Sequence, residues 1–148
     1  MIEAVSECNL TEVLPLIRRY QDFYQVPRMA EEKNIQFFSQ FGEGSPFGCQ
    51  FIYRQQGSAV AFATVYFSFS STIAEKVAVL NDVFVEPNHR GEGIAKLLID
   101  HCRDYAALLG AVRLQWVTAL DNQSAQSAYD KMDTKKSSWH FYTYPAKA

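Results

Sequence analysis

Hydrophobic residues recur along this chain with two different periods, and each change of period marks the boundary of a predicted element. Spacings of three and four residues predict helices, whereas unbroken or alternating apolar runs predict strands. Helices are predicted from residue 9 onward and over residues 28–41, 93–109 and 122–132. Strands are predicted over residues 2–5, 48–54, 58–68, 77–85, 112–119 and 139–144.

Local signals mark several of these boundaries. Asn9 and Glu12 predict a capping box, in which the Asn9 side chain accepts from the Glu12 N–H. Gly110 follows the third helix at the position where a left-handed residue commonly ends a helix. Gly57 predicts a tight turn between two strands. The order β-α-α-β-β-β-α-β-α-β predicts an α/β fold, with a mixed sheet and helices on both faces.

The segment over residues 80–99 carries the first indication of function. An apolar strand ends at Pro87, and Arg90-Gly91-Glu92-Gly93 then leads into an amphipathic helix. Glycines at a helix start let a ligand approach the backbone, and the first N–H groups of the helix have no partner within it. Such a site attracts phosphate. Glycines that serve only to form a tight turn would give the same sequence pattern.

Three phosphate-binding patterns compete for this loop. A dinucleotide fingerprint G-x-G-x-x-G fails because Lys96 stands where the third glycine belongs, and the Walker pattern occurs nowhere in the chain. The pattern [RQ]-x-x-G-x-[GA] is met by Arg90, Gly93 and Ala95. About thirty residues later, Asn122, Ala125, Tyr129 and Lys131 match N-x-x-A-x-x-x-Y-x-K.

In this order and at this spacing, the two motifs resemble those of the GCN5-related N-acetyltransferase (GNAT) superfamily. The link from Tyr129 to the aromatic residues 139–144 is similar to that of the yeast-type histone and polyamine acetyltransferases and their bacterial relatives. The resemblance implies a single N-acetyltransferase domain over residues 1–148. Its sheet would be mixed and mainly antiparallel, with splayed central strands. Met132-Asp133 stands where typical members have Gly-Phe, which puts the usual turn into the last strand in doubt.

The resemblance also implies acetyl-CoA as co-substrate, and no metal. Its pyrophosphate would lie on the loop, and its pantetheine arm would pair with the predicted strand over residues 77–85. Arg90 would add a charged contact, although an ion pair with Glu86 or Glu92 is an equal alternative. The implied cofactor-binding residues are Val83, Phe84, Val85, Arg90, Gly91, Glu92, Gly93, Ile94, Ala95, Lys96, Asn122, Ala125 and Tyr129. Asn122 also suits a helix N-cap, and Tyr129 suits packing on the core.

Two residues are candidate catalysts. Tyr129 would be the general acid, because a tyrosine with a pKa of about 10 stays protonated beside a thiolate whose own value is about 8.5. Asp82 is the candidate general base, with a structural hydrogen-bond role or a water relay as alternatives. Related polyamine acetyltransferases carry a carboxylate at the position of Asn81, which cannot act as a base. Strand alternation predicts Asn81 and Asp82 on opposite faces.

The function these residues imply is acetyl transfer from acetyl-CoA to a primary amine of a small molecule, polyamine or amino-acid-like, by direct attack in a ternary complex. A non-catalytic acyl-CoA-binding module and an acetyltransferase of a peptide or protein amine are the alternatives. The predicted acceptor-binding residues are Asp22, Tyr24, Tyr66, Asn81 and Trp116.

Composition narrows the partners. The chain has 148 residues, a net charge of −2 and scattered basic residues, so no basic surface for nucleic acid is expected. No apolar run approaches the ~20 residues of a membrane span. Three cysteines without metal-binding spacing suggest reduced thiols in a cytoplasmic protein. The aromatic segment near the C-terminus suggests pairing across a homodimer interface.

Overall fold

The computed structural model describes residues 1–147, which form two compact units, Met1–Trp116 and a second that begins at Val117. The first unit holds β1 (Ile2–Ala4), α1 (Leu10–Phe23), α2 (Glu31–Phe38), β2 (Gly48–Gln55), β3 (Ser58–Ser70), β4 (Glu75–Val85), the 3-10 turn η1 (Pro87–His89), α3 (Ile94–Leu108) and β5 (Leu114–Gln115). The second unit contains α4 (Gln123–Asp130). The single domain over residues 1–148 stays a prediction.

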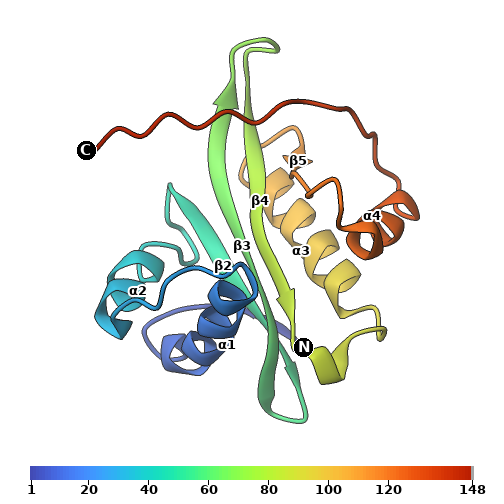
Figure 1. Cartoon of the computed structure of the whole chain (residues 1–148). Coiled ribbons are helices and arrows are strands. Elements are labelled where there is room, and N and C mark those ends of the chain that lie inside the picture. The colour runs from blue at the N-terminus through green and yellow to red at the C-terminus, as the bar shows by residue number, and fades with distance from the viewer. Residues whose placement is uncertain (148) are drawn as a thin grey trace. The chain divides into compact units, whose positions relative to one another are not determined.

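The sheet confirms the predicted fold class. Its strands follow the order β1-β2-β3-β4-β5, and every neighbouring pair is antiparallel except β4 and β5, which are parallel. Helices α1 and α2 lie on one face of this sheet and α3 lies on the other (Figure 1). The long β3–β4 hairpin runs through the centre of the unit and carries residues toward both helical layers.

Strand alternation explains how the two layers are held. On the α1 face, Ile52, Phe62 and Phe84 are buried in one cluster with apolar residues of the helix. On the other face, the Phe51 ring meets the rings of His101 and Tyr105 on α3, with ring centroids 4.6 and 5.2 Å apart. Adjacent residues of β2 therefore pack against opposite helical layers, because side chains along a strand alternate between the two faces of the sheet.

Helix ends agree with the sequence in one case and not in another. Gly110 has a φ of +91° directly after the α3 cap, as predicted. The predicted capping box at Asn9 is wrong, because the Asn9 side chain bonds the Ser6 N–H and the Ala4 carbonyl instead. Glu12 reaches the guanidinium of Arg54 at 2.7 Å and so cannot return to Asn9.

Two predicted strands are shorter or missing. The strand predicted over residues 112–119 pairs only at Leu114 and Gln115, and Val117 just beyond is 86% exposed. The strand predicted over residues 139–144 is wrong, because that segment has no regular structure and Trp139 is 87% exposed. Aromatic and β-branched residues favour strands only where neighbours cover their side chains.

The short β5 leaves one edge of β4 open. It pairs with β4 only at Ala78 and Val79. Beyond Val79, within residues 1–147, no strand pairs with β4 on the side of β5. The backbone hydrogen-bonding groups on this edge of β4 are therefore not paired with another strand from residue 80 onward. The splay of the central strands stays a prediction.

The buried ring of Phe62 allows a test of how much the core on the α1 face contributes to stability. Phe62 has no exposed surface, so Phe62→Ala is expected to lower the free energy of unfolding by about 3–5 kcal/mol through lost burial and a residual cavity. Phe69 on the same strand is 79% exposed, and Phe69→Ala should change stability by less than about 0.5 kcal/mol. Urea unfolding of both variants checks this, and equal losses would contradict it.

Candidate active site

The centre of β4 contains a β-bulge at Asn81. Thr64 of β3 pairs with Asp82, whereas the next residue, Val65, pairs with Leu80. Asn81 is therefore one residue more than β3 can match. Leu80 and Asp82 stand two positions apart and would share a face in a regular strand. The extra residue instead sends Leu80 to the α3 face and Asp82 to the α1 face.

The bulge corrects the prediction that Asn81 and Asp82 lie on opposite faces. The Asn81 Nδ2 donates to the Asp82 Oδ1 at 3.0 Å, so their side chains meet. Asn81 remains exposed, and Asp82 is only 5% exposed. Alternation fails here because it assumes a regular pleat, which a bulge interrupts.

Asp82 is surrounded by neutral hydrogen-bond donors. The Asn81 amide donates to its carboxylate. Thr64 of β3 is its cross-strand partner, and the hydroxyls of Thr64 and of Tyr20 on α1 act on Asp82 as neutral donors that lower its pKa. Behind Thr64, the Gln50 Nε2 donates to the Thr64 Oγ1 at 3.1 Å. Asp82 forms no ion pair within the described residues 1–147. A carboxylate this deeply buried without a cation is costly and is typical of a functional group.

This environment shifts the pKa of each titratable group in it. Burial raises the pKa of the Asp82 carboxyl above its ordinary value, and the three hydrogen bonds oppose that rise. Burial and the nearby Asp82 charge raise the pKa of Tyr66 to about 12 and raise the pKa of Tyr20 further. Both tyrosines therefore remain neutral, and Asp82 is the group of this cluster that can exchange a proton at moderate pH.

Aromatic rings surround Tyr20, the α1 neighbour of this carboxylate. The Tyr20 ring meets Tyr24, Phe62 and Phe84 edge to face, with ring centroids 5.1, 5.7 and 6.2 Å apart. Tyr66 is half-buried against Phe41 at 5.0 Å. Three predicted acceptor residues, Tyr24, Tyr66 and Asn81, are thus gathered around Asp82 and Tyr20.

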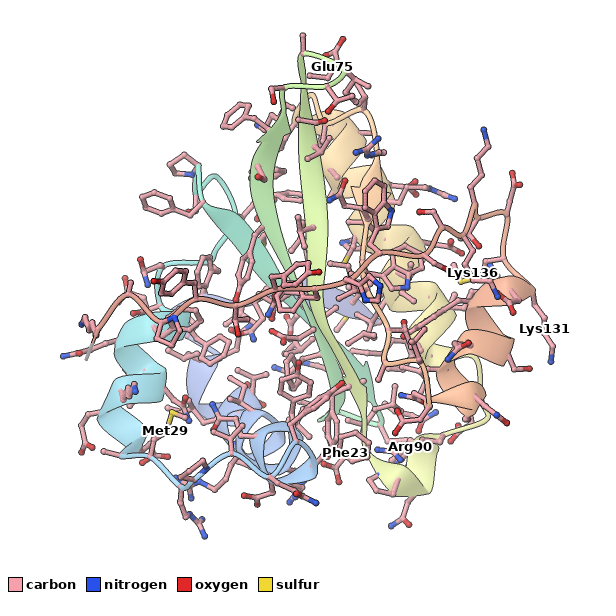
Figure 2. All side chains as sticks on the ribbon, turned by 45° about the horizontal axis from the view of Figure 1, so that its top comes forward. Phe23, Met29, Glu75, Arg90, Lys131 and Lys136 are labelled. Carbon is pink, nitrogen blue, oxygen red and sulfur yellow. The ribbon has the colours of Figure 1, made fainter. Side chains whose placement is uncertain are left out.

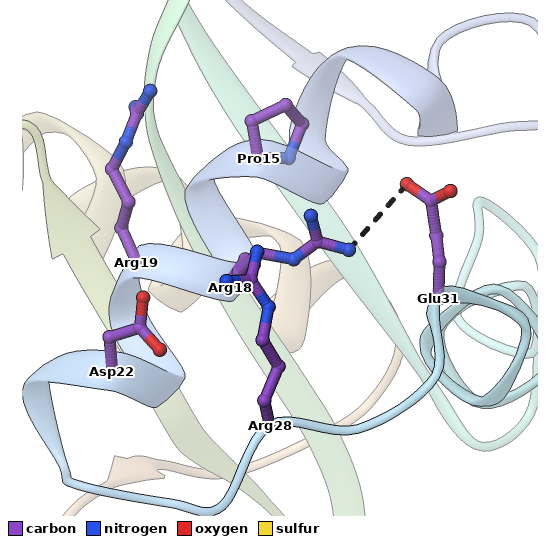
Figure 3. Close-up of a pocket in the computed structure, with 6 residues that line it drawn as sticks. All are labelled: Pro15, Arg18, Arg19, Asp22, Arg28 and Glu31. Carbon is purple, nitrogen blue, oxygen red and sulfur yellow. Dashed lines mark ion pairs between the residues drawn. The ribbon is translucent and has the colours of Figure 1, made fainter.

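Asp22 is not part of that cluster. It lines a separate cavity of about 320 Å³ with Pro15, Arg18, Arg19, Arg28 and Glu31 (Figure 3). Positions 15, 18, 19 and 22 form one face of α1, opposite the face that packs on the sheet. The predicted pairing of Asp22 with the site is therefore not found. Trp116, just beyond β5, is half-buried.

The loop before α3 has the conformation that its glycines suggest. Gly91 and Gly93 adopt φ of +82° and +80°, and a Cβ at either position would meet no atom within 4 Å. No side chain caps the start of α3 at Gly93. The first N–H groups of the helix therefore face a space that an anion can enter.

Arg90, labelled in Figure 2, anchors this loop to the end of β4. Its Nε donates to the Val85 carbonyl at 2.9 Å, and its guanidinium lies 5.7 Å from the centre of the Phe84 ring. The alternative ion pair with Glu86 or Glu92 does not form, because Glu86 pairs with Arg19 and Glu92 lies near His89.

Two residues outside the motif hold the same loop. The His89 ring lies 2.6 Å from the Gln55 side-chain oxygen, and the Gln55 amide donates to Glu92 at 3.1 Å. Neither His89 nor Gln55 was predicted to hold this loop. Only the hairpin turn brings these residues together, so no local pattern could have found them.

The second unit carries the other motif. Asn122 caps α4, where its Oδ1 accepts from the Ala125 N–H at 3.2 Å. Tyr129 is half-buried near the end of this helix, and its carbonyl accepts from Thr134 at 3.0 Å. The predicted N-cap is confirmed, and the roles predicted for Asn122 and Tyr129 toward acetyl-CoA stay predictions.

Sequence reasoning missed three residues of the carboxylate network: Tyr20, Gln50 and Thr64. Gln50 and Thr64 are buried polar residues in phase with Ile52 and Phe62 on their strands. A polar residue on the apolar face of a strand was the available signal.

Residues 1–147 contain neither a metal-binding cluster nor a helix able to span a membrane. No group of three or more His, Cys, Asp or Glu side chains there could hold a metal ion. None of the helices in that range has the length and apolar character needed to cross a bilayer.

Comparisons with known sequences all point to acetyltransferases. The model of the acetyltransferase (GNAT) family matches residues 13–133. The chain is 28% identical over 130 residues to the Bacillus subtilis protein described as uncharacterized N-acetyltransferase YhfO, covering 88% of this chain and 86% of that protein. It is 32% identical over 81 residues to the Saccharomyces cerevisiae D-amino-acid N-acetyltransferase HPA3, covering 55% of this chain and 50% of that protein.

Solved structures share the fold. A probable acetyltransferase superposes with a TM-score of 0.85 at 24% identity, covering 100% of this chain and 99% of that one. The aminoglycoside N-acetyltransferase AAC(6')-Iy in complex with CoA gives a TM-score of 0.79 at 19% identity, covering 99% and 95%.

The buried carboxylate predicts an unusual dependence of stability on pH. Because the folded state raises the pKa of Asp82, its contribution is favourable below the ordinary value of about 3.9 and is lost as pH rises through the raised value. Asp82→Asn removes that loss, so the variant should melt roughly 2–4 °C above the wild type at pH 7, about 1 kcal/mol for a chain of this size.

Thermal unfolding from pH 4 to pH 8 measures this gap, which should shrink toward pH 4. The exposed Asp133 offers the control, because Asp133→Asn should show no such trend. A wild type that is the more stable protein at pH 7 would contradict the raised pKa.

Proposed function

The chain belongs to the acetyltransferase (GNAT) family, and we propose that it transfers the acetyl group of acetyl-CoA to a primary amine of a small molecule, by direct attack in a ternary complex. The observation that carries this proposal is Asp82, a buried carboxylate held only by neutral donors beside the open edge of β4. A family member that only bound acyl-CoA would have no use for such a base.

The open edge and the loop fit a bound acetyl-CoA. Its pyrophosphate would meet the N–H groups of Ile94, Ala95 and Lys96 at the uncapped start of α3. The loop residues from Arg90 to Gly93 would surround it. The pantetheine arm would pair with the backbone of Val83 to Val85, and an N–H there would stabilise the oxyanion of the tetrahedral intermediate.

Asp82 would supply the base. An acceptor arrives as an ammonium, and the unpaired carboxylate attracts it and accepts its proton. The neutral nitrogen then attacks the thioester carbonyl carbon, a C–N bond forms, and the C–S bond breaks with its electron pair passing to sulfur. The second proton that the nitrogen loses replaces the one delivered to the sulfur, so that the net reaction releases the single proton taken up by Asp82. The products are an acetylated amine and CoA.

The leaving sulfur needs a proton, and we propose Tyr129 as its donor. A phenol with an ordinary pKa of about 10 is protonated at neutral pH and can donate to a thiolate. Asn122 and Ala125 are proposed contacts of the pantetheine arm. Asn122 would act through its amide nitrogen, because its Oδ1 already caps α4.

The acceptor site would be built from the groups around Asp82. Tyr24 and Tyr66 offer aromatic faces that suit an alkylammonium, and Asn81 offers an exposed amide. Trp116 remains a proposed contact, whereas Asp22 faces away and is dropped. HPA3 is by its name an enzyme of D-amino acids, which supports an amino-acid-like acceptor beside the polyamine alternative.

Two properties of the whole protein stay predictions. The free thiols of Cys8, Cys49 and Cys102 support the cytoplasmic location. The exposed aromatic segment over residues 139–144 supports a homodimer, because such surfaces commonly mark interfaces.

The proposed reaction predicts amine-dependent release of free thiol from acetyl-CoA. Polyamines, D- and L-amino acids and basic peptides form the acceptor panel. With the best acceptor, Asp82→Asn and Tyr129→Phe are each expected to lower kcat about 100-fold, as for the loss of a general base or acid.

Tyr142→Phe provides the control, because Tyr142 is 87% exposed and is not a proposed contact of acetyl-CoA or of the acceptor. CoA affinity should persist in all variants. Full activity of Asp82→Asn would rule out Asp82 as the general base. A wild type that binds CoA but shows no amine-dependent release of thiol would contradict acetyl transfer.

A matched pair of glycines tests the loop. Gly93→Ala is expected to weaken CoA binding about tenfold, roughly 1.4 kcal/mol, because its Cβ enters the space left for the pyrophosphate. Gly110 lies at the other end of α3 with a similar φ of +91° and equally open surroundings. Both alanines should strain the backbone alike, and isothermal titration should show weaker binding only for Gly93→Ala. Equal affinities would contradict the assigned loop.

A further inference from the structure

Gln50 is a fully buried polar residue in the second strand of the sheet. Its Nε2 donates to the Thr64 Oγ1 at 3.1 Å, directly across the β2–β3 pair. Its side-chain oxygen has no hydrogen-bond partner within residues 1–147. The molecule therefore keeps an unsatisfied acceptor in its core, beside the chain of groups that leads to Asp82.

Folding gives no reason for this side chain. An unpaired buried carbonyl lowers stability, whereas an apolar side chain of similar size would suit the neighbouring Ile52 and Phe62. The backbone bonds of Gln50, from the Val5 N–H and to the Phe41 carbonyl, would survive any side-chain replacement. Side chains that break local rules of packing are expected at functional positions.

We propose that Gln50 is a positioning residue for acetyl transfer, whose amide orients the Thr64 hydroxyl so that it donates to Asp82. This inference rests on the proposed function, in which Asp82 is the base. A hydroxyl has one hydrogen to donate and accepts through its lone pairs. Because the Gln50 amide is the donor in this pair, the Thr64 hydrogen is left for Asp82, the cross-strand partner of Thr64.

The consequence is a more stable charged form of Asp82. The groups that face it are Tyr20 from α1, Thr64 and Tyr66 from β3 and Asn81 from β4, with Gln50 of β2 behind Thr64. All are neutral at moderate pH, so hydrogen bonds alone offset the burial of the charge. Loss of the Gln50 amide lets the Thr64 hydroxyl rotate away and weakens one of those bonds.

The test is the pH profile of kcat/KM, whose acidic limb reports the base of the free enzyme. Gln50→Leu should move that limb up by about half a pH unit, an activity loss of about threefold on the acidic side only. Thr64→Val should move it by about one unit, about tenfold, and Thr64→Ser should return it to the wild-type position. Gln36→Leu, an exposed site on α2, is the matched control and should leave the profile unchanged.

Thermal unfolding separates positioning from packing. Gln50→Leu should melt at or above the wild-type temperature, because it removes the unsatisfied acceptor. An acidic limb that stays at the wild-type pH overturns the proposal, as does a lower melting temperature with an unchanged profile.

A second readout needs no turnover. Titration of the Asp82 carboxyl carbon by NMR should give a higher midpoint in Gln50→Leu than in the wild type. If the wild type acetylates no amine yet this midpoint rises, positioning stands and the proposed function fails. An unmoved midpoint overturns the positioning role.

Discussion

The site depends on one extra residue in β4. With Asn81 inserted, Leu80 faces α3, while Asp82 and Phe84 face α1. Phe84 then reaches Phe62 in the core, and Asp82 comes opposite Thr64 on the face that Tyr20 covers. A regular strand would send Leu80 and Asp82 to the same side. The bulge thus places a titratable residue at the centre of a strand whose flanking residues pack in the hydrophobic core.

The acidic residues of the first unit differ in whether a basic side chain pairs with them. At the hairpin end of β2, Arg54 pairs with both Glu3 and Glu12, so those carboxylates are neutralised within the fold. Arg19 likewise pairs with Glu86 just beyond β4. Asp82, the more deeply buried acid, receives only neutral donors. In the proposed reaction, the acceptor ammonium would supply the positive charge that the protein does not place beside Asp82. The ammonium would then bind next to the group that accepts its proton.

Sequence patterns predicted the parts of the site that depend on local chemistry. The glycines of the loop had to adopt positive φ, and Asn122 had to cap a helix, because each follows from a few adjacent residues. The bulge could not be predicted, since an apolar run such as β4 has no alternation to interrupt. The bond from Gln55 to Glu92 of the loop also escaped, because the fold brings together residues that lie far apart in the sequence. The aromatic residues 139–144 failed as a strand because propensity alone does not create a partner edge.

Two unfavourable groups stand close together on the α1 face of this sheet: the charge of Asp82 and the unpaired carbonyl of Gln50. Each lowers the stability of the folded state, and each could be removed by an apolar or neutral residue of similar size. Thr64 lies between them: it accepts from the Gln50 amide and is the cross-strand partner of Asp82. Independent packing defects would be scattered through the core, whereas these are joined by one hydrogen-bonded chain. Their connection supports the proposal that this part of the sheet serves proton transfer at the expense of stability.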